Sequence, residues 1–316
     1  MHRPSTAPQR GTRALPLPHV SCLYAALALV LCGCAHAVQP DRVATIDDPS
    51  LDEISGIAAS RLQPGAVWVL EDGGNPTALF GIDRDGRRRA QVEIVGVRNI
   101  DWEALAPFQW QGRPHLLIAD VGDNDAVRGR VLLHAVPEPA TLQDASVAPT
   151  WTMELVWSDG PRDCEGVAVD MVRGEILLVS KRTSPPQLYI ARLPAGDGVA
   201  DGPLRAEWAA PLAGVPVTPE AEVRANPSTA WRHQPTGIAL SPDGRRLAVL
   251  SYTDILLYTR RGDDSWAEAV SRAPRVLPLP AMRQAEAITW SAEGERLLIS
   301  GEQAPAAIHT LKVPAL

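Results

Sequence analysis

Pairs of polar side chains, two positions apart, recur five times along the chain, and most of their members are carboxylates. The pairs are Glu53 with Ser55, Asp101 with Glu103, Asp163 with Glu165, Gln234 with Thr236, and Gln284 with Glu286. Residues two apart on a strand point the same way, so each pair would face one side of a strand. Carboxylates gathered around one axis repel one another, and they need a cation, a proton or a basic neighbour.

Oxygen-only side chains of this kind suit Ca²⁺ best among the common metal ions. The predicted calcium ligands are Glu103, Glu165, Glu286, Asp120 and Asp123. Basic residues in the same segments, Lys181, Arg182 and His233, could instead offset the negative charge or hold an anionic ligand. A plainer explanation is a water-filled pore that the polar side chains solvate.

The pairs belong to a repeated pattern that predicts strands. The second residue of each pair is followed by a small residue and then a branched or long apolar one, and a glycine comes shortly afterwards: Gly65, Gly112, Gly174, Gly244 or Gly294. A run rich in Val, Ile and Leu follows each glycine. Strand, glycine turn and strand predict a hairpin in every repeat.

Further strands complete each repeat as a four-stranded unit. Third strands are expected at residues 78–83, 130–136, 187–193, 255–260 and 307–313, and fourth strands at 89–95, 151–157, 204–212 and 275–279. The last repeat lacks a candidate for its fourth strand, and residues 42–46 are left over at the other end. These two observations predict an all-β, five-bladed β-propeller over residues 42–316, closed into a ring by the N-terminal strand. A sixth blade would have to lie within residues 211–232, which are too few for four strands and favour a long surface loop.

A propeller brings the polar pairs to one end of its channel. The loops before the first strands and the loops after the second strands lie on the same face. The second strands are followed by Glu71 and Asp72; Asp120, Asp123 and Asn124; Lys181 and Arg182; Tyr252 and Asp254; and Glu302. The sequence therefore predicts an acidic funnel. Its ligand-facing residues would be Glu53, Ser55, Asp101, Glu103, Asp163, Glu165, Lys181, His233, Thr236 and Glu286.

The first residues indicate export. Three arginines precede an apolar run over residues 20–31, which is too short to span a bilayer, and the letters LCGC follow at 31–34. This segment resembles a bacterial lipoprotein signal, which implies that residues 1–33 are removed and that Cys34 receives the lipid. Residues 34–41 would be the tether, and Ala35 after the lipidated cysteine implies the periplasmic face of the outer membrane. The alternative is an ordinary secretory peptide.

Charge and cysteine content narrow the partners. Removal of residues 1–33 takes away three arginines and no acid, so the formal net charge of −7 becomes −10. Nucleic acid is therefore an improbable partner, and we expect a monomer that meets the membrane through its lipid. Cys164 would be the only cysteine besides Cys34, which excludes an intrachain disulfide. It is expected to be a small buried packing residue.

Short motifs resemble known propellers. The segment SPDGRRLA at 241–248 looks like the hairpin of Tol-type and gluconolactonase-like propellers. The segments EISGI at 53–57, DWEALA at 101–106 and ADVGDN at 119–124 resemble a family of exported bacterial propeller lipoproteins of uncertain function, similar also to phytase-like propellers. The resemblance implies the fold and brings no assigned catalytic residue.

Two classes of function remain open. One is a binding or interaction protein with Ca²⁺ in the funnel and a small or polymeric ligand, for which the nine tryptophans offer stacking surfaces. The other is a hydrolase that uses the same carboxylates, either a glycosidase or a Ca²⁺-dependent phosphoesterase. A carboxylate pair ~5 Å or ~6.5–9.5 Å apart would favour a glycosidase, whereas three or more carboxylates at one point would favour a metal.

Overall fold

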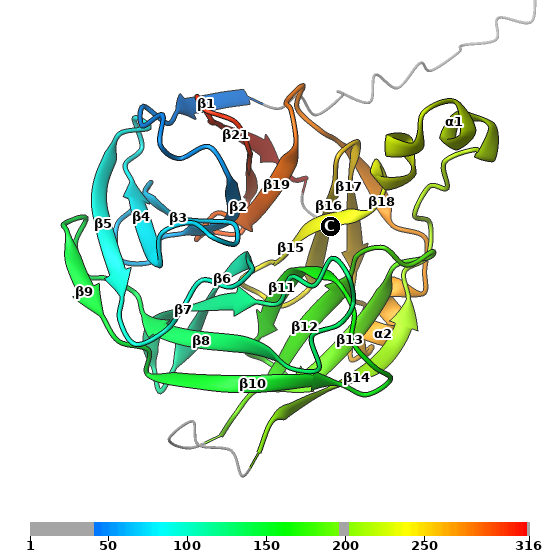
Figure 1. The fold of residues 1–316 in the computed structure, drawn as a ribbon, viewed down its shortest axis with the longest axis horizontal. Helices are drawn as coiled ribbons and strands as arrows, with labels where there is room; N and C mark the ends of the chain where they lie inside the picture. The colour runs from blue at the N-terminus through cyan, green and yellow to red at the C-terminus, as the bar shows by residue number, and fades with distance from the viewer. Residues whose placement is uncertain (1–40, 196–201, 315–316) are drawn as a thin grey trace, which may run out of the picture. The chain divides into compact units, whose positions relative to one another are not determined.

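Short antiparallel strands separated by tight turns make up most of the chain in the computed structural model, which describes residues 41–195 and 202–314 (Figure 1). All of these residues belong to one compact unit, residues 38–316. The predicted signal peptide, Cys34 and nearly all of the predicted tether lie outside the described residues. In the described part of the chain, no helix combines the length and the apolar character that crossing a membrane requires.

The described strands pair into sheets of four, eight, four and five strands, and five four-stranded units can be followed within them along the chain. They are β2 (Ile54–Ala59), β3 (Val67–Glu71), β4 (Ala78–Ile82) and β5 (Arg88–Ile94); β6 (Trp102–Trp110), β7 (Arg113–Asp120), β8 (Val131–Pro137) and β10 (Trp151–Trp157); β11 (Cys164–Asp170), β12 (Glu175–Ser180), β13 (Gln187–Arg192) and β14 (Leu204–Pro211); β15 (Pro235–Leu240), β16 (Arg246–Ser251), β17 (Asp254–Thr259) and β18 (Arg275–Pro278); and β19 (Ala285–Trp290), β20 (Arg296–Gly301) and β21 (Ala307–Lys312) with β1 (Asp41–Thr45). The prediction of an all-β propeller is confirmed.

The first strand of each unit lies at the centre. β2, β6, β11, β15 and β19 each contact the next in turn, and β19 contacts β2 again, so the five strands form a ring (Figure 1). The five predicted hairpin glycines all have positive φ, between 62° and 83°. This backbone conformation costs glycine little and other residues more, which explains its recurrence there.

The fourth strand of the last unit comes from the N-terminus, as the sequence predicts. β1 pairs antiparallel with β21, from Asp41 opposite Thr310 to Thr45 opposite Ala307. Ile46 is fully buried in the cluster between the last unit and the first, and its N–H donates to the carbonyl of Ala306 at 2.8 Å. The ring is thus closed by strands from opposite ends of the described chain.

Several elements depart from the predicted pattern. A short strand, β9 (Ala145–Val147), adds a fifth strand to the first unit by pairing parallel with β5. β10 and β14 also pair in parallel, which joins the second and third units into one eight-stranded sheet. A short helix, α2 (Trp266–Val270), lies between β17 and β18 and begins with a capping box at Ser265 and Glu268.

The segment 211–232, predicted to be a surface loop, contains helical turns. These are α1 (Glu220–Ala225) and the 3₁₀ helix η1 (Pro227–Trp231). Neither has a buried residue, so the sequence has no helical pattern of apolar residues that would predict them. The Asn226 side chain accepts from the Ser228 N–H at 3.2 Å and so caps η1.

Candidate functional site

Each central strand carries a β-bulge at the same place, and the bulged residue is the polar residue of the repeat. The ladder register shifts across Ser55, Glu103, Glu165, Thr236 and Glu286. A bulge leaves its extra residue unpaired and redirects the side chain. All five are buried. The predicted equivalence of these positions is therefore a structural one.

The two hydroxyl residues of this set fasten one central strand to the next. Ser55 Oγ donates to the carbonyl of Trp102 at 2.8 Å, and Thr236 Oγ1 donates to the carbonyl of Ala285 at 2.6 Å. In both cases the acceptor immediately precedes the bulged glutamate of the neighbouring strand. Ser55 and Thr236 thus hold Glu103 and Glu286 in place, a positioning role that the polar pattern alone did not distinguish from ligand binding.

The channel narrows below the glutamates. A cavity of about 10 Å³ lies between Glu103, Glu165 and Glu286, room for about one water molecule. Two residues beyond each bulge comes an apolar side chain: Ile57, Leu105, Val167, Ile238 or Ile288. All five are buried, and they form the apolar layer of the channel.

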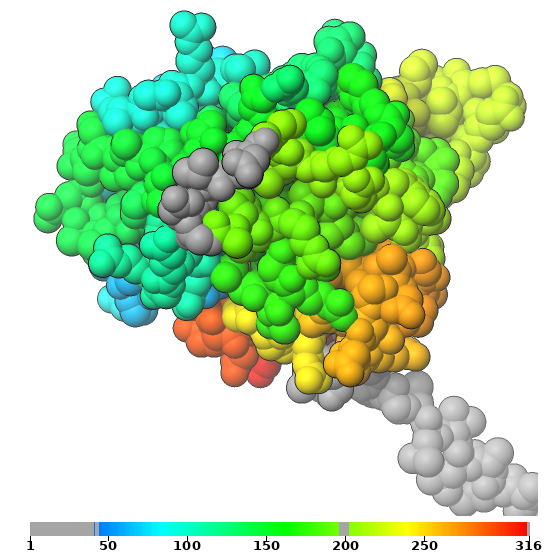
Figure 2. Space-filling model, turned by 90° about the horizontal axis from the view of Figure 1, so that it is seen from below, coloured from blue at the N-terminus to red at the C-terminus, as the bar shows by residue number. Residues whose placement is uncertain are grey.

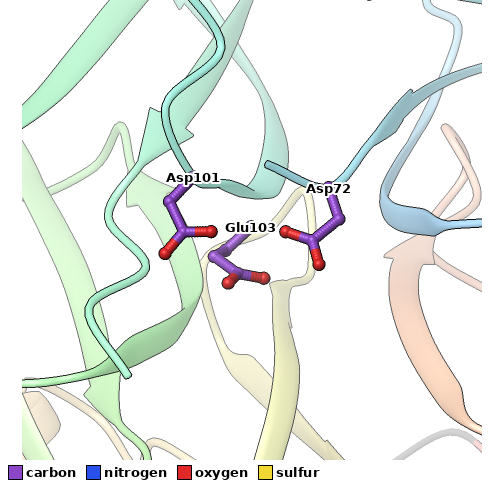
Figure 3. A group of neighbouring side chains, drawn as sticks. All are labelled: Asp72, Asp101 and Glu103. Carbon is purple, nitrogen blue, oxygen red and sulfur yellow. The ribbon is translucent and has the colours of Figure 1, made fainter. Parts of the chain in front are cut away.

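Three carboxylates meet above this layer. Asp72, from the end of β3, lies beside Asp101 and Glu103 from the start of β6, and one oxygen of each lies within 4.8 Å of the others (Figure 3). Asn99 holds the two segments together, because its amide donates to the carbonyl of Asp72 at 2.8 Å and its oxygen accepts from Trp102 N–H at 3.1 Å. We refer to Asp72, Asp101 and Glu103 as the carboxylate triad.

The triad is electrostatically strained. Burial, followed by the charges of Glu165 and Asp72, raises the pKa of Glu103 well above its ordinary value. Burial and the neighbouring Asp72 raise the pKa of Asp101 to about 6, and burial also raises the pKa of Asp72. No hydrogen bond or ion pair among the described residues engages the carboxylates of Asp101 and Glu103. A proton or a cation would relieve this repulsion.

Gly73 and Gly122 have no side chain, and this makes room for the carboxylates of the triad. A Cβ atom on Gly73 would lie under 3.0 Å from Asp101, and one on Gly122 would lie under 3.0 Å from both Asp101 and Glu103. Neither glycine has the positive φ that would require it for conformational reasons. Space beside the carboxylates is what calls for glycine here.

Gly122→Ala should therefore disturb the triad and lower the melting temperature by a few degrees, because overpacking typically costs about 1–3 kcal/mol. The matched control is Gly129→Ala, in the same loop, where a Cβ would meet nothing within 4 Å. Thermal melts of the two variants in EDTA would test this. Equal melting temperatures for the two variants would show that the space beside the carboxylates is not constrained.

No protein-family model and no curated protein matches the sequence. Among solved structures, the chain is similar to one from the hydrazine synthase of Kuenenia stuttgartiensis, at 12% identity and a TM-score of 0.43, over 82% of this chain and 71% of that chain. It is also similar to one from a nidogen/laminin complex, at 13% identity and a TM-score of 0.43, over 83% and 81%. At such identities the similarity concerns the fold, and the predicted membership of an exported bacterial family stays a prediction.

The other two bulged glutamates have partners of their own. Lys181 forms an ion pair with Glu165, and Tyr252 OH donates to Glu286 Oε1 at 2.5 Å. Burial outweighs these partners: the pKa of Glu165 is raised to about 7 and that of Glu286 to about 8. Burial alone would lower the pKa of Lys181, but Glu165, Glu286 and Glu103 around it raise it. One buried lysine is thus shared among three carboxylates.

Arg182 offsets a second part of the acidic funnel. Its Nε pairs with Asp163 Oδ2 at 2.7 Å, and its other end donates to Asn124. Asp163 also accepts from the Asp123 N–H at 3.1 Å. Lys181 and Arg182, which follow β12, therefore both pair with carboxylates. Offsetting negative charge was one of the two roles predicted for them.

The remaining predicted site residues lie apart from the triad or have other partners. Asp120 is fully buried, pairs with Arg128 at 2.7 Å and accepts from the Ile100 N–H. Asp123 accepts from the N–H groups of Val127 and Arg128. These contacts shape the loop 121–130, and the triad does not include either predicted ligand. Glu53 accepts from the amide of Asn75 at 2.6 Å, and His233 Nδ1 lies 2.8 Å from Thr253 Oγ1.

Asp72 and Tyr252 belong to the site but were not among the predicted ligands. Both follow a second strand, at positions that the sequence placed at the mouth of the funnel. The repeated pattern identified the right face for them. The pattern could not show that Asp72 and Tyr252 are better candidates than Asp120 and Asp123, which also lie at the end of a second strand, in the second unit.

Proposed function

We propose that the protein is an exported, lipid-anchored binding protein whose funnel holds Ca²⁺ in the carboxylate triad and presents it to an oxygen-rich ligand. The observation that carries the proposal is the convergence of Asp72, Asp101 and Glu103 within 4.8 Å. A glycosidase needs two carboxylates on opposite sides of an open cleft. Three carboxylates at one point instead match a site for a hard cation.

The ligand chemistry favours calcium over transition metals. The triad offers only oxygen, whereas zinc, copper and iron sites prefer nitrogen or sulfur. Ca²⁺ takes six to eight oxygen ligands. Three side chains would leave several positions for water or for hydroxyl and carboxylate oxygens of a ligand, which is how a bound cation would recruit one.

Pairing within the funnel weighs against the phosphoesterase alternative. A phosphate ester is held best by several cationic side chains with free donors. Lys181 is paired with Glu165, and Arg182 is paired with Asp163 and Asn124. An incoming phosphate would have to compete with these carboxylates, so a neutral or cation-bridged ligand suits the funnel better.

Calcium titration of the purified mature protein by calorimetry tests the proposal. We expect saturable binding near 1:1, with a dissociation constant on the order of 10⁻⁶–10⁻³ M. Asp101→Asn should weaken binding at least tenfold, because it removes one of three charges at the ion. Asp85→Asn, which changes an exposed aspartate in a hairpin turn, is the control and should bind as the wild type does. Absence of binding, or equal binding by both variants, would refute the calcium site.

The membrane anchor is a separate part of the proposal. The letters LCGC at 31–34 support lipidation of Cys34, which would place the propeller at the periplasmic face of the outer membrane. Cells fed an alkynyl fatty acid should incorporate it into the wild type, and Cys34→Ala should abolish incorporation and leave uncleaved precursor. Labelling that survives Cys34→Ala would contradict the assignment.

A further inference from the structure

The tryptophans divide sharply by exposure. Seven of the nine are buried, while Trp208 is 52% and Trp231 is 40% exposed. Trp208 lies on β14, and its indole N–H donates to Gln187 at 2.8 Å. Trp231 ends η1 and borders a cavity of about 260 Å³. The stacking surface expected from the tryptophan content is therefore reduced to one candidate.

This cavity, the Trp231 cavity, has an apolar side and a polar side. Val223 from α1 and Val217 from the loop before α1 join Trp231, and Thr183, His233 and Gln234 come from the neighbouring loops. In Figure 2 the yellow-green segment that contains α1 and η1, residues 220–231, protrudes at one edge of the surface. The cavity is thus formed where this protruding segment meets the loops of the third and fourth units.

One polar group beside the cavity lacks a partner. The Gln234 amide donates to the carbonyl of Thr183 at 3.2 Å, which fixes its orientation. Its Oε1 is buried and has no hydrogen bond within the described protein. A buried acceptor without a donor costs free energy, but this oxygen is shielded from solvent and a ligand in the cavity would reach it only after the neighbouring side chains move.

The positive charge of Arg182 beside the cavity is already paired with other residues of the protein. Arg182 lines the cavity, with its guanidinium 4.9 Å from the centre of the Trp231 ring. The same guanidinium is engaged by Asp163 and Asn124. It therefore holds the indole in position and offers little net charge to an anion. The groups that remain for a ligand are the aromatic surface and the hydrogen-bonding side chains of Thr183 and His233.

We propose that the Trp231 cavity binds one neutral sugar ring. A pyranose has an apolar C–H face that stacks on an indole, and it has hydroxyl groups at its edge that can pair with His233 and Thr183, which line the cavity. The volume is just below that of sites for drug-sized ligands, which suits one ring of a monosaccharide or of a glycan chain. This inference does not depend on a cation in the triad.

Saturation-transfer difference NMR on the mature protein tests the proposal, with methyl glucoside, methyl galactoside, N-acetylglucosamine and its neutral dimer N,N′-diacetylchitobiose as probes. Each probe is measured in EDTA and in Ca²⁺, so that a failure of the calcium site leaves this test intact. We expect transfer to the ring protons of at least one probe. Trp231→Ala should reduce the affinity for that probe at least tenfold, and Trp231→Phe, which keeps an aromatic face, should lose less.

Trp208→Ala is the matched control, because it removes an exposed tryptophan outside the cavity, and it should leave the affinity unchanged. Circular dichroism melts establish that all three variants are folded. The proposal is overturned if no probe shows transfer at millimolar concentration, or if Trp231→Ala and Trp208→Ala bind alike. Trp231-dependent transfer to an unstructured peptide but to none of the sugars would also overturn it, in favour of a peptide site.

Discussion

Removal of residues 42–47 should lower the melting temperature of a chain that begins at residue 34 by about 10 °C or more. The deletion removes most of β1, exposes the edge of β21 and takes away the buried side chains of Ala44 and Ile46. It also breaks the backbone bonds from Ile46 to Ala306 and from Asp47 to Gly86, which link the last unit to the first. A loss of several kcal/mol follows, and each kcal/mol shifts the melting temperature by about 2–4 °C in a domain of this size.

Two comparisons make the test of ring closure specific. A chain that begins at residue 41 keeps β1 and should melt with the full mature protein. Ile46→Ala should cost about 2–5 kcal/mol, the usual range for an aliphatic side chain truncated in a core. If the chain lacking residues 42–47 melts together with the chain that begins at residue 41, the N-terminal strand does not close the ring.

The protein in EDTA should lose stability from pH 6.5 to about pH 8 and level off above that. Glu165 and Glu286 have pKa values of about 7 and about 8 in the folded state, both above the ordinary 4.5. A carboxyl whose folded pKa is raised binds more protons in the folded state, so its contribution to stability is complete below pH 4.5 and is lost as the pH rises through 7 to 8. We expect the melting temperature to fall by on the order of 5 °C over this window.

Calcium should reduce this loss. A cation in the triad favours ionised carboxylates and stabilises the folded state by about 2.7 kcal/mol at a hundred times its dissociation constant. The difference in melting temperature between Ca²⁺ and EDTA should therefore be larger at pH 8.5 than at pH 6.5. Melts begin at pH 6.5 because the buried His134, whose pKa is lowered to about 4, acts in the opposite direction below that.

A pair of glutamine substitutions assigns the pH dependence. Glu286→Gln removes the group with a pKa of about 8 and should flatten the decline above pH 7. Glu295→Gln changes an exposed glutamate in the hairpin of the same unit and should follow the wild type. A decline that is equally steep in both variants would assign the pH dependence to other groups.

The fold could be predicted because local signals repeat. Each hairpin glycine has a positive φ, and each predicted strand is present to within about three residues at either end. The missing elements have no local signal of their own. β9 is three residues long and pairs with a strand some 50 residues away, and α1 buries nothing. Their existence depends on tertiary contacts, which a repeat pattern does not contain.

The candidate site was predicted only in part, for a related reason. The repeat correctly placed Glu103, Glu165 and Glu286 at equivalent buried positions, since the bulge recurs with the sequence. Which carboxylates actually meet depends on the loop contacts between units. Asn99 draws Asp72 toward Asp101, while Arg128 binds Asp120. Such pairings join residues some 8 to 30 positions apart, and spacing alone does not rank them.

The apolar layer beneath the glutamates is a barrier to the passage of ions through the channel. Ile57, Leu105, Val167, Ile238 and Ile288 line it two residues beyond the bulges, and their side chains offer an ion no ligand to replace its hydration. Traffic to the triad must therefore pass through the acidic mouth. A partner that binds over that mouth would slow the dissociation of a cation from the triad without contacting the carboxylates. The residence time of the cation would then report whether the partner is bound.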